Sequence, residues 1–123
     1  MNIKKGNLFE GMPGRVPEEV FAALVETAEL KLERIVSQGQ ATPPGKWLAQ
    51  ARGEWVILLR GHGRLGFEED NEIVDLLPGD FVRIPAGCRH RVAWTDPRKH
   101  TVWLALHYAV NEVTAKGARS SGR

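Results

Sequence analysis

The chain has very little cysteine and no long apolar run. Its 123 residues include a single cysteine, Cys88. A lone cysteine cannot form an internal disulfide or a Cys-pair zinc finger, which fits a reducing compartment. No apolar run approaches the ~18 residues of a membrane span, and the first residues lack the apolar stretch of a signal peptide. We therefore expect a cytoplasmic protein with no membrane partner.

The body of the chain also lacks a surplus of charge. The whole sequence has a formal net charge of +2. Residues 111–123 carry three basic side chains and one acidic side chain, so residues 1–110 carry fourteen of each sign. A neutral body has no electrostatic footprint for nucleic acid, and we expect no such partner. Because residues 111–123 have little to bury, we expect a disordered tail there.

Helix signals are scarce. Thirteen glycines and seven prolines separate short apolar runs, a pattern typical of a many-stranded sandwich or barrel. The exception follows Pro17, where acidic residues precede apolar residues at helical spacing. We expect one core in a chain of this length. The prediction is an N-terminal segment over residues 1–29, with a short helix packed on a barrel of residues 30–110.

The apolar runs predict the strands of that barrel. They lie at residues 30–36, 55–59, 72–77, 81–84, 90–94 and 101–108. Residues 30–36 alternate loosely, which indicates a strand with one solvated face, whereas 55–59 are continuously apolar and indicate a strand covered on both faces. Since alternate residues of a strand share a face, Glu54 is expected to point the same way as Val56 and Leu58.

Two spacings in the sequence resemble the motifs of a known family. From Gly79 to His90 the chain has glycine, five residues, proline, one residue, glycine, two residues and histidine. Six residues separate Glu54 from Gly61. These patterns resemble the second motif, and the end of the first motif, of the cupins, small barrels that often hold one divalent metal. The resemblance covers about residues 30–108 and implies an all-β double-stranded β-helix, or jelly roll.

The first motif is degenerate in this chain. Typical cupins place His-x-His four or five residues before the glutamate, and here Gln50 lies four residues before Glu54. The resemblance makes Glu54 and His90 ligands of a metal inside the barrel. Burying a lone carboxylate is costly, so Glu54 must be neutralised by a cation, a proton or an arginine. Arg60 and Arg91 are the basic candidates for that alternative.

Two further side chains are candidate ligands of the same metal. Gln50 is a candidate for a weak oxygen ligand, and the alternative is a hydrogen bond across the barrel mouth. His107 lies in an apolar strand and is a candidate fourth ligand, the alternative being a hydrogen bond to a backbone carbonyl. Imidazole and carboxylate ligands suit Zn, Ni, Mn, Fe or Cu without distinguishing them.

Two functions from different classes follow from the resemblance. The first is a metal-binding cupin with activity on a small organic molecule, such as a dioxygenase, isomerase or hydrolase. The second is a noncatalytic cupin that binds or senses a small molecule, with a structural metal or none. The missing His-x-His favours weak metal binding. Cupin barrels commonly pair through an outer sheet face, so the resemblance also implies a homodimer.

Overall fold

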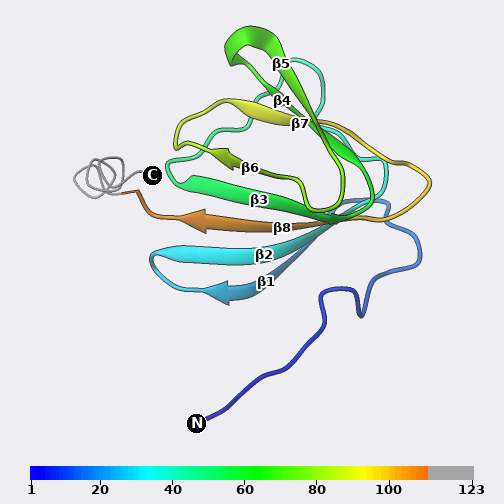
Figure 1. Cartoon of the computed structure of the whole chain (residues 1–123), viewed down its shortest axis with the longest axis vertical. Helices are drawn as coiled ribbons and strands as arrows, with labels where there is room; N and C mark the ends of the chain where they lie inside the picture. The colour runs from blue at the N-terminus through cyan, green and yellow to red at the C-terminus, as the bar shows by residue number, and fades with distance from the viewer. Residues whose placement is uncertain (111–123) are drawn as a thin grey trace.

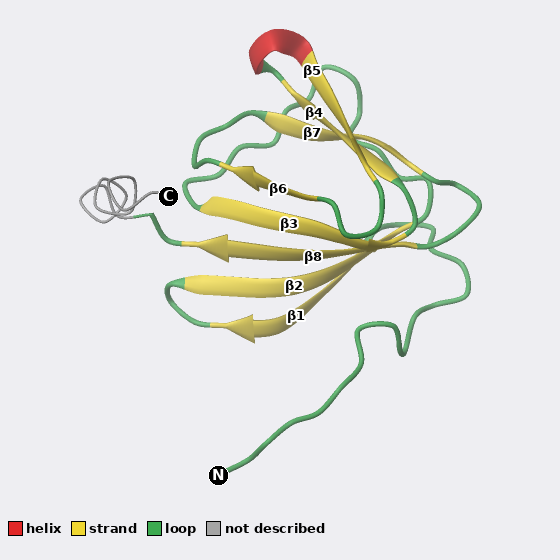
Figure 2. Cartoon of the chain, in the orientation of Figure 1, coloured by secondary structure: helices red, strands yellow, loops and turns green. Residues whose placement is uncertain are grey.

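A computed structural model describes residues 1–110, which form eight strands and one short helical turn (Figures 1 and 2). The strands are β1 (Val20–Glu26), β2 (Leu30–Ser37), β3 (Gly53–Arg60), β4 (Gly63–Phe67), β5 (Glu72–Leu76), β6 (Phe81–Ile84), β7 (His90–Thr95) and β8 (Thr101–Tyr108). The turn is a 3-10 helix, η1 (Glu69–Asn71). The prediction of an all-β jelly roll is confirmed.

The strands form two antiparallel sheets. One sheet has five strands in the order β1-β2-β8-β3-β6, and the other has three in the order β5-β4-β7. The long connection between β2 and β3 returns to β7 at one backbone bridge, where Leu48 pairs with His90. The buried core lies between the sheets and includes Val56, Leu58, Leu65, Leu76, Ile84, Trp103 and Ala105.

Strand alternation sets which side chains reach this core. In β3, Glu54, Val56 and Leu58 are buried, while Trp55 and Ile57 between them are only half-buried. The predicted common face of Glu54, Val56 and Leu58 is therefore confirmed. In β8, Trp103 and Ala105 face the same interior, because adjacent antiparallel strands pair Ala105 with Val56 and Trp103 with Leu58.

The prediction of a short helix after Pro17 is wrong. Residues Val20–Glu26 form β1, which lies at the edge of the larger sheet and pairs with β2 along its length. The register shifts between Ala23 and Val25, a β-bulge that inserts one extra residue into the strand. That insertion breaks the two-residue alternation and leaves apolar side chains at the three- and four-residue spacings of a helix.

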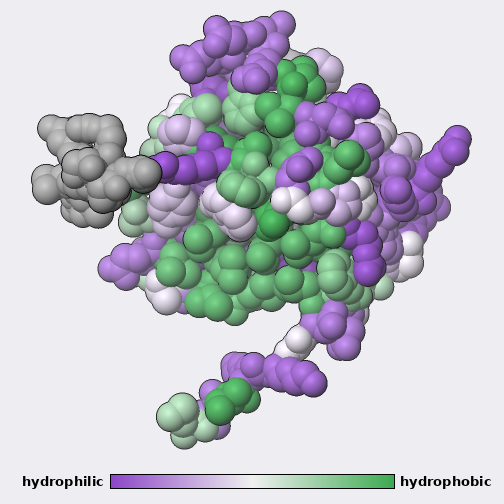
Figure 3. All heavy atoms as spheres, viewed as in Figure 1, coloured by the Kyte–Doolittle hydropathy of each residue, from purple (hydrophilic) through white to green (hydrophobic). Residues whose placement is uncertain are grey.

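Apolar side chains stay exposed on the larger sheet. Figure 3 shows a broad apolar area over β1, β2 and β8. On β1 alone, Phe21, Leu24 and Val25 are each about half exposed. The homodimer inferred from the cupin resemblance stays a prediction, and so do the domain boundaries and the cytoplasmic location. Residues 111–123, predicted to be a disordered tail, lie outside the described residues.

No helix among residues 1–110 is long and apolar enough to cross a membrane.

Candidate functional site

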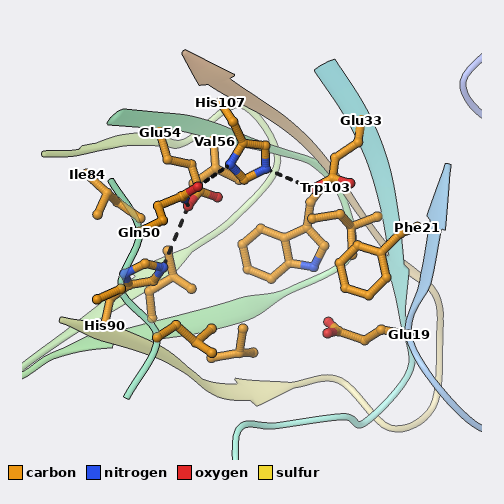
Figure 4. A pocket seen from close by; sticks show the side chains of 15 residues that line it. Glu19, Phe21, Glu33, Gln50, Glu54, Val56, Ile84, His90, Trp103 and His107 are labelled. Atoms are coloured by element: carbon orange, nitrogen blue, oxygen red, sulfur yellow. Dashed lines mark hydrogen bonds and ion pairs between the residues drawn. The ribbon is translucent and has the colours of Figure 1, made fainter. Parts of the chain in front are cut away.

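A cavity of about 230 Å³ lies between the two sheets. Apolar side chains line it together with carboxylates, imidazoles and an amide, which lie around the whole cavity (Figure 4). The lining residues are Glu19, Phe21, Glu33, Ile35, Leu48, Ala49, Gln50, Glu54, Val56, Leu65, Ile84, His90, Val92, Trp103 and His107. All four predicted ligand residues, Gln50, Glu54, His90 and His107, are in this set.

The strand register brings the polar residues together. Glu54 in β3 lies directly opposite His107 in β8 and Ile84 in β6. His90 begins β7 in the other sheet, and its backbone forms two hydrogen bonds with Leu48, of 2.6 and 2.9 Å. This bridge holds the segment before Glu54 against β7, so that Gln50 reaches the cavity.

Gln50 connects the two predicted ligands of the larger sheet. Its amide nitrogen Nε2 donates to Glu54 Oε1 at 2.9 Å. Its carbonyl oxygen Oε1 lies 3.2 Å from His107 Nδ1. A carbonyl oxygen only accepts, so Nδ1 of His107 is the donor in this bond. The predicted hydrogen-bonding alternative for Gln50 is thus present, formed to two cavity side chains.

Glu33 is a site residue that the sequence analysis missed. Its Oε2 lies 2.8 Å from His107 Nε2, and the residue is only 6% exposed. Each ring nitrogen of His107 therefore lies beside an oxygen, the amide oxygen of Gln50 at Nδ1 and the carboxylate of Glu33 at Nε2. Lys31 Nζ lies 3.6 Å from the other carboxylate oxygen. His107 is therefore paired with side chains, not with a backbone carbonyl.

His90 and Glu54 face each other without a hydrogen bond. His90 Nδ1 lies 3.0 Å from the backbone oxygen of Cys88, so this nitrogen donates to the carbonyl. The other nitrogen, Nε2, faces Glu54 Oε1, 3.6 Å away. Both residues are more than nine-tenths buried. A buried imidazole and a buried carboxylate thus face the same part of the cavity.

No arginine neutralises Glu54. Among residues 1–110, His90 is the one basic side chain within 4.0 Å of its carboxylate, and neither candidate arginine forms an ion pair with it. Arg60 lies over the ring of Phe9 at 4.1 Å, and Arg91 lies over the ring of Trp47 at 5.7 Å. The arginine alternative for Glu54 is therefore not what the structure shows.

A second polar group lies at the other end of the cavity. Ser37 donates a hydrogen bond of 2.5 Å to Glu19 Oε2, and the indole nitrogen of Trp103 donates to Ser37 Oγ at 3.2 Å. Trp103 is 3% exposed, and its ring lies between this group and the Gln50–Glu54–His90 end (Figure 4). The bond to Ser37 fixes the ring that separates the two ends.

The other two histidines lie outside the cavity. His62 Nε2 is 2.7 Å from Asp75 Oδ1, and Arg64 Nε is 3.0 Å from the same atom. The hydrogen bonds from His62 and Arg64 hold the pKa of Asp75 below its ordinary value. His100 Nε2 lies 3.2 Å from the backbone oxygen of Gly14. Both histidines serve local structure at the surface.

The described part of the chain contains no cluster of three or more His, Cys, Asp or Glu side chains that could hold a metal ion. Glu54 and His90 form a pair, and His107 is engaged by Gln50 and Glu33. The four residues named from the sequence thus share one cavity, but their ligand atoms do not converge on one point. Their role as metal ligands stays a prediction.

Comparison with known proteins agrees with the fold. A family model described as a cupin domain matches residues 34–107. A candidate mannose-6-phosphate isomerase from Ralstonia eutropha JMP134 is 46% identical, with a TM-score of 0.85 over 88% of this chain and 100% of that chain. The search of curated proteins found no significant match.

Two more distant structures share the fold. A cupin superfamily protein from Desulfitobacterium hafniense DCB-2 is 16% identical, with a TM-score of 0.67 over 80% of this chain and 84% of that chain. A protein of unknown function from Streptococcus pyogenes is 16% identical, with a TM-score of 0.71 over 90% of this chain and 91% of that chain. The family match over residues 34–107 establishes that the chain belongs to the cupin family.

Proposed function

We propose that this cupin binds one small organic molecule in the cavity between its sheets. The observation that carries the proposal is the composition of the cavity wall. Ile35, Val56 and Val92 offer apolar contact, while Glu54 and His90 offer buried polar groups whose facing atoms are 3.6 Å apart. Ligand sites in proteins are typically concave and largely apolar, with a few placed polar groups. This cavity has that composition.

The charge of the wall restricts the ligand. The Ralstonia relative is named for a sugar phosphate, mannose 6-phosphate. A phosphate is ordinarily held by Arg, Lys or clustered backbone N–H groups. None of the fifteen lining residues is Arg or Lys, and three are glutamates. A phosphorylated sugar would bring its negative charge against Glu19, Glu33 and Glu54, so we propose a neutral or cationic ligand.

Filling the cavity should abolish ligand binding. We expect saturable binding of benzyl alcohol or benzylamine to the wild type, and no binding of mannose 6-phosphate. At ten times its Kd a ligand adds about 1.4 kcal/mol to the free energy of unfolding, seen as a rise in Tm. Ile35→Phe places a larger side chain on the cavity wall and should remove the rise.

The control for this experiment is Leu24→Phe, which enlarges an exposed side chain of β1 that does not line the cavity. It should bind as the wild type does in isothermal titration. Binding that persists in Ile35→Phe, or no saturable binding of either compound to the wild type, would contradict the proposed function.

A divalent cation between His90 and Glu54 is the second candidate. A metal holds histidine nitrogen at ~2.0–2.1 Å and carboxylate oxygen at ~2.0–2.2 Å, so two ligands of one ion are spaced as His90 Nε2 and Glu54 Oε1 are. A ligating histidine also commonly donates its other N–H to a carbonyl, as His90 does to Cys88. When bound, the ion would supply a Lewis acid at the cavity wall. Two protein ligands predict weak binding.

Metal binding should depend on His90. We expect Zn²⁺ titrated into chelator-treated protein to bind with one-to-one stoichiometry, and His90→Ala to weaken it by at least tenfold. His62→Ala, which changes a histidine outside the cavity, should bind as the wild type does. Elemental analysis after loading and desalting provides the second readout. Less than about a tenth of an equivalent of metal in the wild type, or equal binding by His90→Ala, would rule out this ion site.

A further inference from the structure

Carboxylates are the charged groups that predominate in the cavity wall. Three glutamates line it, with no arginine or lysine among the lining residues. Glu33 has two basic partners, since His107 lies 2.8 Å away and Lys31 3.6 Å away. Glu19 accepts from the Ser37 hydroxyl and Glu54 from the Gln50 amide. Among residues 1–110, neither Glu19 nor Glu54 forms an ion pair with an arginine or lysine.

Of the carboxylates of Glu19 and Glu54, that of Glu54 is the more deeply buried. It is 8% exposed, and the Gln50 amide is its one hydrogen-bond donor among residues 1–110. A carboxylate has about four lone-pair sites, so most of its accepting capacity is unused. His90 Nε2, in a residue 6% exposed, lies 3.6 Å from Oε1, too far for a hydrogen bond. Buried charge of this kind is costly unless a cation or donor meets it.

The opposite end of the cavity offers the same kind of contact. Glu19 lies across the cavity from His90, and the indole ring of Trp103 lies between the two ends (Figure 4). The face of an indole ring attracts cations within about 6 Å of its centroid. The ring is held by its bond to Ser37, the same hydroxyl that donates to Glu19.

Resting on the proposed function, we infer that the natural ligand of this cavity is a small organic cation bearing a primary amine. An ammonium group has three donors and no acceptor. It can donate to the buried carboxylate of Glu54, which would repel a carboxylate or phosphate anion. The carbon body of the amine then contacts Ile35, Val56 and Trp103. At ~30 Å³ per water, the cavity has the volume of about eight waters, which suits a compact amine.

The test compares three probes of one shape and different charge. Benzylamine, benzyl alcohol and benzoate are titrated calorimetrically into full-length protein that has been treated with chelator and desalted. This treatment removes metal as a competing cation. We expect benzylamine to bind at least tenfold more tightly than benzyl alcohol, and benzoate to show no binding. Equal or tighter binding of the alcohol would overturn the inference while leaving the proposed function in place; absence of binding by all three would overturn both.

Charge-removing variants locate the effect. Glu54→Gln keeps the shape of the side chain and should weaken benzylamine at least tenfold, with benzyl alcohol affected less than threefold. Glu19→Gln removes the other carboxylate charge, at the less buried end of the cavity, and replaces Glu54→Gln in the test if that variant fails to fold. Glu69→Gln, an exposed change in η1, is the control and should bind both probes as the wild type does. Benzylamine binding unaffected by Glu54→Gln and Glu19→Gln would show that these carboxylates do not select the ligand.

Discussion

Replacing Glu33 with alanine should lower the free energy of unfolding by about 3–5 kcal/mol, the loss expected when one partner of a buried ion pair is removed. The side chain of Glu33 is 8% exposed and that of His107 15% exposed, and their atoms are 2.8 Å apart. Without the carboxylate, the buried ring of His107 keeps only the Gln50 oxygen as a side-chain partner. Urea or guanidinium denaturation followed by circular dichroism measures the loss.

Two further variants separate this ion pair from simple packing. Lys31→Ala removes the other basic side chain near Glu33. Because the Lys31 side chain is 35% exposed, this change should lower the free energy of unfolding by less than about 1 kcal/mol. The double variant Glu33→Leu/His107→Leu replaces the pair with apolar groups and should recover most of the stability lost in Glu33→Ala. A double variant that is no more stable than Glu33→Ala would contradict a coupled pair.

Gly63→Ala should destabilise the protein by about 1–3 kcal/mol, the usual cost of forcing extra atoms into a packed core. A Cβ at this position would lie 2.5 and 2.6 Å from Cζ2 and Cη2 of Trp103. These contacts are too short, and Trp103 is 3% exposed, so the indole has little room to move aside. The added methyl should push the ring from its place in the cavity wall and weaken its bond to Ser37.

Gly14→Ala is the matched control, because a Cβ there has no atom within 4 Å. We expect its melting temperature and near-ultraviolet circular dichroism to match the wild type. Gly63→Ala should lower the melting temperature, alter the near-ultraviolet signal of tryptophan and reduce binding of cavity probes. Wild-type stability and an unchanged tryptophan signal in Gly63→Ala would show that Trp103 is not held as the structure describes.

The local pattern of apolar runs and turn residues predicted most of the strands, but it did not predict β1. The predicted strands over residues 81–84 and 101–108 coincide with β6 and β8, because apolar runs bounded by turn residues are a local property. The predicted helix after Pro17 is β1, because a bulge between Ala23 and Val25 gives the strand helix-like spacing. Hydrogen bonds to the edge of β2 decide the conformation of β1. In three of the six residue pairs between β1 and β2, the two residues are twelve or more positions apart in the chain, so a local pattern does not report this pairing.

The sequence predicted those site residues whose position depends on a single strand or a single motif. Alternation placed Glu54 inside, and the motif from Gly79 to His90 placed the imidazole. The sequence analysis missed Glu33 because the loose alternation of residues 30–36 predicts a strand with one solvated face. Its burial comes from β2 pairing with β1 on one side and β8 on the other, which sets Glu33 opposite both Ala23 and Ala105.

The sequence by itself determined that this chain is a cupin barrel and that a buried carboxylate at Glu54 needs a partner, since periodicity and motif spacing are local. Only the tertiary structure decided which partner it has. Glu54 meets Gln50 and His90, while Arg60 and Arg91 lie against aromatic rings elsewhere. The reason is register: which side chains meet across two sheets depends on pairings between strands far apart in the chain, and a shift of one residue would turn each side chain to the other face.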